Sequence, residues 1–71
     1  MARVKSLRYI VTGPGIEEPP SYAEQGPALS RAITAALKRK DATFYVRDSV
    51  LDTILGRAES DERGWVTSRW S

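Results

Sequence analysis

The clearest periodic pattern in this chain lies in residues 27–40, PALSRAITAALKRK. Large apolar residues recur there every four positions, and alanines fill the same stripe, while polar residues occupy the opposite side. This spacing predicts an amphipathic helix from about Pro27 to Lys40, with its apolar stripe packed on a core. The residues of the predicted stripe are Leu29, Ala32, Ile33, Ala36 and Leu37.

Two signals compete for the start of this helix. Ser21 and Glu24 have the spacing of a capping box, which would begin the helix early. Gly26-Pro27 offers a later start, with proline at the first helical position. At the other end, residues 38–40 are all basic and suit a last helical turn, where the helix dipole favours cations. We expect the helix to end at Asp41.

Two short stretches have the residue types and the alternation of β-strands. Residues 3–12 end in a β-rich run in which Tyr9 and Val11 face one way and Arg8 and Ile10 face the other. Residues 43–47, TFYVR, place Phe44 and Val46 on one face and Tyr45 and Arg47 on the other. Both runs are predicted to be strands.

The stretch from Ser49 to Ala58 fits two structures. Its apolar residues follow a helical period, and Asp48 or Ser49 suits the cap of such a helix. Against a helix, Gly56 would lie in its interior at a cost of roughly 1 kcal/mol. Residues 60–64, SDERG, form a polar turn ending in glycine that suits a hairpin into residues 65–69. We favour the hairpin and keep the helix as the alternative.

These elements predict a small single α+β domain over residues 1–71. One amphipathic helix would pack on a short, mostly antiparallel sheet in the order β-α-β-β-β, or β-α-β-α-β if residues 49–58 are helical. Residues 13–26 begin with a Gly-Pro-Gly turn and hold three of the four prolines, so we expect a proline-rich loop there. A chain of this length buries only about 60% of the surface of its unfolded form.

The composition excludes much of catalytic chemistry. Without cysteine or histidine, the chain cannot form disulfides, thiolate or imidazole zinc sites, or the usual nucleophile–base pairs. The Gly13–Gly15 turn is not a phosphate loop, because no Lys-Ser or Lys-Thr pair follows at the required spacing. We therefore expect a protein that is not an enzyme and uses neither a metal nor a cofactor.

The sequence also bears on location and origin. Apolar runs reach only three or four residues, whereas a membrane span needs about 20, and no signal-peptide pattern opens the chain. A cytoplasmic protein that does not contact a membrane is the expectation. Arginine outnumbers lysine by eight to three and asparagine is absent, which indicates a GC-rich genome. An actinobacterial or phage accessory protein fits that composition; a phage protein would act in the host cytoplasm.

Both tryptophans lie near the end of the sequence, at Trp65 and Trp70. In a strand over residues 65–70 they would point to opposite faces, because side chains alternate. One helix covers only one face of a small sheet, so the uncovered face would carry one tryptophan, with Tyr45 or Leu55 nearby. These four residues predict a surface for a homodimer or another protein partner. The alternative is that Trp70 lies at a frayed end or packs on a sheet edge.

Charge supports a second function class. The net charge is only +2, but basic and acidic blocks alternate along the chain. Positive side chains near an aromatic ring suit phosphates and a stacked base, which predicts nucleic-acid binding as the alternative function. Acidic blocks in the same small domain would repel that backbone. The residues of this alternative site are Lys38, Arg39, Lys40, Tyr45 and Arg47.

Overall fold

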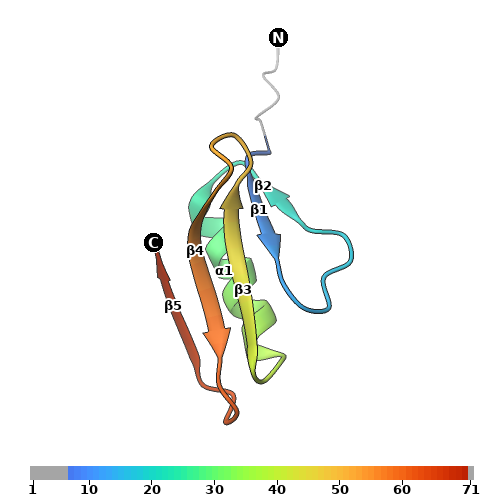
Figure 1. Ribbon diagram of the computed structural model, residues 1–71, viewed down its shortest axis with the longest axis vertical. Coiled ribbons are helices and arrows are strands. Elements are labelled where there is room, and N and C mark those ends of the chain that lie inside the picture. The colour runs from blue at the N-terminus through green and yellow to red at the C-terminus, as the bar shows by residue number, and fades with distance from the viewer. Residues whose placement is uncertain (1–6, 71) are drawn as a thin grey trace.

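The computed structural model describes residues 7–70, which form one helix packed on a five-stranded sheet (Figure 1). The strands lie in the order β2-β1-β3-β4-β5, and all neighbouring strands are antiparallel. The predicted α+β class and the β-α-β-β-β order are confirmed, with one short extra strand before the helix. The elements are β1 (Tyr9–Thr12), β2 (Ser21–Tyr22), α1 (Gln25–Leu37), β3 (Ala42–Asp48), β4 (Thr53–Ser60) and β5 (Val66–Trp70).

The extra strand β2 lies inside the stretch predicted to be a proline-rich loop. It pairs with β1, where Tyr22 is opposite Tyr9 and Ser21 is opposite Ile10. The amide of Val11 also donates to the carbonyl of Pro20, at 3.1 Å. The early part of the predicted first strand, residues 3–6, lies outside the described residues.

Residues 49–58 form a turn and a strand, so the hairpin is correct and the helical alternative is wrong. Asp48 accepts hydrogen bonds from the amides of Val50 and Leu51, at 2.9 and 3.1 Å, and this closes the turn after β3. The register then shifts between Val46 and Arg47, which leaves Leu55 as the extra residue of a β-bulge. Gly56, costly inside a helix, instead lies opposite Val46 in the sheet.

The ends of α1 differ from both sequence signals. The helix begins at Gln25 with Glu24 as the N-cap, because Ser21 is held in β2 and cannot cap it. The capping box and the later start at Pro27 are therefore both wrong. The helix ends at Leu37, so residues 38–40 follow the last turn instead of forming it. Asp41 adopts a positive φ of 52° where the chain turns into β3.

The face that α1 buries is made of alanines. Within the predicted stripe, Ala32 and Ala36 are buried as expected and Leu29 and Ile33 are partly buried against the core, whereas Leu37 is 66% exposed. The physical reason is distance: methyl side chains let the helix lie close to the ring of Phe44 on the sheet. The core consists of Val11, Ala28, Ala32, Ala36, Ala42, Phe44, Val46 and Ala58.

A glycine allows the turn after β1 to close over this core. A Cβ atom on Gly13 would lie 2.2 Å from Cδ2 of Phe44, which is closer than any side chain tolerates. The Gly-Pro-Gly turn therefore packs its backbone directly on the aromatic ring. Among the described residues, no helix has the length and the apolar character needed to cross a membrane.

Candidate functional site

The helix lies on one side of the sheet only, which leaves the other side uncovered (Figure 1). Side chains alternate along β3, so Phe44 and Val46 face α1 while Tyr45 and Arg47 face away from it. Strand register extends this uncovered surface, termed the open face, across the neighbouring strands. The open face comprises Ile10, Thr12, Thr43, Tyr45, Arg47, Ile54, Arg57, Glu59, Thr67 and Arg69.

A hollow of about 430 Å³ lies on the open face and is lined by Tyr45, Ile54, Arg57, Arg69 and Trp70. Nη2 of Arg57 lies 3.7 Å from Oε1 of Glu59, a loose ion pair. The Nε atom of Arg57 is buried and has no hydrogen-bond partner in the described part of the chain. The hollow therefore combines aromatic surface with two guanidinium groups.

The structure brings together two of the four predicted interface residues. Tyr45 and Trp70 meet at the hollow, whereas Leu55 is half-buried at the bulge and does not line it. Trp65 precedes β5, in the turn, where it is 72% exposed. Trp70 lies opposite Gly56, which in turn lies opposite Val46, so the register places Trp70 on the side of the sheet that faces α1, at the β5 edge, where its ring covers Gly56.

The five residues predicted for nucleic acid are spread over three places. Lys38 and Arg39 line a cavity on the helix side of the sheet. Lys40 lies beside Gly64, in the turn before β5. Tyr45 and Arg47 lie on the open face, where Arg47 forms an ion pair with Asp52. The structure thus does not assemble these residues into one cluster.

Three residues that line the hollow were not predicted from the sequence: Ile54, Arg57 and Arg69. In the strand register, Arg57 on β4 lies directly opposite Arg69 on β5 and directly opposite Tyr45 on β3. The sequence could have placed Arg57 and Arg69 on a strand face, because side chains alternate between the two faces along residues 53–60 and 66–70. The strand register that places these residues beside Tyr45 depends on the turns and on the bulge at Leu55. No local sequence pattern predicts that bulge.

The two edges of the sheet differ in their capacity to pair. One edge is β2, which has two residues and directly follows Pro19-Pro20. The other edge is β5, which has five residues and no proline. Short strands and prolines block pairing with another chain, whereas a longer edge leaves a row of backbone groups available. Within residues 7–70, β5 is therefore the edge that presents the longer row of backbone groups.

A partly buried ion pair joins Arg8, directly before β1, to Asp48 at the end of β3. Nε of Arg8 donates to both carboxylate oxygens of Asp48, at 2.9 and 3.0 Å, and only 1% of Asp48 is exposed. These hydrogen bonds from Arg8 lower the pKa of Asp48 to about 2, helped by the backbone amides of Leu51 and Val50 and opposed by burial. The hydrogen bond with Asp48 likewise raises the pKa of Arg8.

Across residues 7–70, no group of three or more acidic side chains is placed to hold a metal ion. The molecule is thus a small α+β domain with one open sheet face and one open sheet edge. Comparison with protein-family models, curated proteins and solved structures found no match to this chain.

Proposed function

We propose that this protein is a non-enzymatic interaction domain that pairs with a second copy of itself through the edge strand β5. The observation that carries the proposal is the asymmetry of the sheet: β2 is short and follows two prolines, while β5 is longer and unblocked. The cytoplasmic location and the phage or actinobacterial origin stay predictions from the sequence.

Every second residue of β5 points its backbone N–H and C=O groups away from β4, as pairing with a second copy requires. The amide of Asp61 donates to the carbonyl of Trp65 at 3.0 Å, so the backbone of Trp65 points toward β4. Because direction alternates along an antiparallel strand, the N–H and C=O groups of Val66, Ser68 and Trp70 point outward. An antiparallel partner centred on Ser68 would exchange hydrogen bonds with all three residues.

When two copies of β5 pair around Ser68, their side chains are also complementary to each other. Val66 would lie opposite Trp70 of the second copy, which pairs apolar surface with apolar surface. Thr67 would lie opposite Arg69 of the second copy, so no two like charges face each other directly. Trp70 is 45% exposed in one copy, and this pairing covers it. Tryptophan is one of the residue types enriched among interface hot spots.

The decisive experiment is Ser68→Pro, measured by sedimentation velocity over a range of concentrations. Proline removes an outward amide that β4 does not use, so the fold should persist while the dimer dissociates to the 7.9 kDa chain. Ser68→Ala keeps the amide and should stay dimeric. A wild-type chain that remains monomeric up to millimolar concentration contradicts the proposal.

A second pair of variants separates loss of dimerisation from loss of the fold. Trp70→Ala should weaken dimerisation about tenfold or more, because it removes the apolar contact with Val66 of the second copy. Trp65→Ala, which lies outside the pairing strand, should change it by less than about twofold. Equal loss in the two variants, or a loss that follows the melting temperature, would show that neither indole acts at an interface.

Nucleic acid is the second candidate, favoured by the hollow on the open face. Tyr45 offers a ring for stacking, and Arg57 and Arg69 offer guanidinium groups for phosphates. For this function we expect labelled single-stranded RNA or DNA to bind with steep salt dependence. The double change Arg57→Gln and Arg69→Gln should abolish binding, whereas Arg63→Gln, outside the hollow, should not. No binding at low salt removes this candidate.

A further inference from the structure

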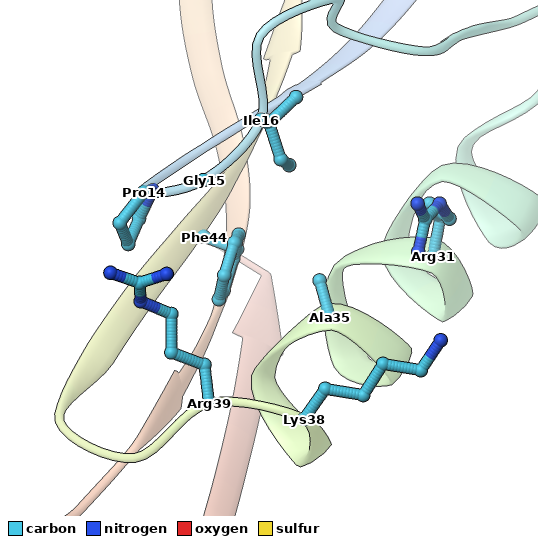
Figure 2. A pocket seen from close by; sticks show the side chains of 8 residues that line it. All are labelled: Pro14, Gly15, Ile16, Arg31, Ala35, Lys38, Arg39 and Phe44. Carbon is cyan, nitrogen blue, oxygen red and sulfur yellow. The ribbon is translucent and has the colours of Figure 1, made fainter.

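A second cavity, of about 240 Å³, lies on the helix side of the sheet between the Gly-Pro-Gly turn and the end of α1 (Figure 2). It is separate from β5 and from the open face, so its role is independent of the proposed function. Its lining residues come from the turn after β1, from α1 and the segment after it, and from β3. They are Pro14, Gly15, Ile16, Arg31, Ala35, Lys38, Arg39 and Phe44.

The rim of this cavity carries three positive charges. Arg31 and Lys38 are seven residues apart, which is about two turns, so both lie on one side of the helical segment with Ala35 between them. Arg39 approaches from the other side and places its guanidinium beside Pro14 (Figure 2). None of the three cations forms an ion pair within residues 7–70, and the lining contains no acidic residue.

The position of Arg39 is held from two directions. The hydroxyl of Ser60 donates to the carbonyl of Arg39 and accepts the amide of Ala42, which anchors the backbone after the helix. At its far end, Nη1 of Arg39 would lie only 3.1 Å from a Cβ atom at Gly15, where φ is +81°. Glycine thus lets the guanidinium lie against the turn, and a side chain there would displace it.

Apolar groups form the wall between these cations. Ile16, Ala35 and Phe44 contribute it, with the ring of Phe44 between the turn and the helix (Figure 2). An apolar cavity of about 150 Å³ holds a benzene molecule, so this cavity has room for one ring and one small anionic group. It is smaller than the roughly 300 Å³ at which pockets for drug-sized ligands begin.

We infer that this cavity binds a phosphate monoester whose organic part is a single small ring. The guanidinium of Arg39 matches phosphate oxygens in a planar, paired geometry, and Arg31 and Lys38 add positive charge from the opposite side of the cavity (Figure 2). The wall of Ile16, Ala35 and Phe44 takes the ring. A ligand without the ring loses the apolar contact, and one without the phosphate leaves the three cations unpaired.

The test is a titration of the full chain with phenyl phosphate, followed by two-dimensional ¹H–¹⁵N NMR. The amide signals of Gly13 and Gly15, in the turn, should shift and saturate, while those of Gly56 and Gly64 should not. Arg39→Gln should weaken binding about tenfold, and Arg31→Gln should weaken it less, because Arg31 lies on the opposite side of the cavity. Lys40→Gln is the matched control, because it removes a neighbouring cation that does not line the cavity.

A second comparison tests the apolar wall. Inorganic phosphate should bind at least tenfold more weakly than phenyl phosphate, and Ala35→Leu should abolish the difference by filling the space beside Phe44. Equal affinity for the two probes, an equal effect of Lys40→Gln, or no saturation would overturn the inference. Ser68→Pro should bind phenyl phosphate normally, so failure here and failure of the proposed dimer are distinguishable.

Discussion

Replacing Phe44 by alanine is expected to lower the free energy of unfolding by about 3–5 kcal/mol. Phe44 is 2% exposed and is the largest fully buried side chain. Most of its core neighbours are alanines, whose short side chains cannot move into the space that the ring leaves. A domain of this length has about 4–11 kcal/mol of stability in all, so the variant should be close to unfolded.

Thermal and urea unfolding, followed by circular dichroism and tryptophan fluorescence, would measure this effect. Tyr45→Ala is the matched control, because it removes an aromatic ring from the next position on the same strand. Tyr45 is only half-buried on the open face, and its loss should cost about 1 kcal/mol. A Phe44→Ala protein that unfolds within a few degrees of wild type would contradict a core centred on this ring.

Replacing Asp48 by asparagine is expected to lower the melting temperature at neutral pH by roughly 10 °C. The change leaves the guanidinium of Arg8 without its carboxylate partner, whose Oδ2 lies 2.7 Å from Nη2. It also weakens the turn after β3, since the amides of Val50 and Leu51 bond to the same carboxylate. Differential scanning calorimetry would measure the shift.

The effect of Asp48→Asn should depend on pH in a defined direction. The pKa of Asp48 is about 2 in the folded protein, against about 3.9 for an aspartate in an unfolded chain. A carboxyl with a lowered pKa contributes stability above the unfolded value and loses it as pH falls through the folded value. The difference between wild type and variant should therefore be full at pH 5 and shrink toward pH 2.

Asp52 provides the matched control for this pH series. It also forms an ion pair, with Arg47, but its side chain is 72% exposed. Exposed pairs contribute little, so Asp52→Asn should shift the melting temperature by no more than a few degrees. Its positive φ of 55° is one that asparagine adopts readily. A wild-type–Asp48→Asn difference that stays constant from pH 5 to pH 2 would rule out this role for Asp48.

Local patterns predicted the elements better than the contacts between them. The Gly56 penalty and the turn at residues 60–64 correctly indicated a hairpin, although apolar spacing suggested a helix. The same spacing placed Ala32 and Ala36 correctly on the buried face of α1, but it also placed Leu37 there, which is exposed. Hydrophobicity ranks side chains by size, but close approach of helix and sheet around Phe44 selects small ones.

The two sites were less predictable than the fold. Tyr45 and Trp70 were recognised as surface aromatics, yet Leu55 lies at a bulge and Trp65 lies before the strand. The basic residues from Lys38 to Arg47 were grouped because they are close in sequence. Alternation along β3 and the turn after α1 then separated them onto opposite sides of the sheet.

By itself, the sequence determined the α+β class, the hairpin after β3 and the absence of thiol and imidazole chemistry, because each follows from residue type or local spacing. Only the tertiary structure decided that Leu37 lies outside the buried helix face, that β5 is the longer edge strand, and that Arg31 joins Lys38 and Arg39 around one cavity. Those features depend on strand order, register and packing distance, which arise when distant segments meet and which no single segment encodes.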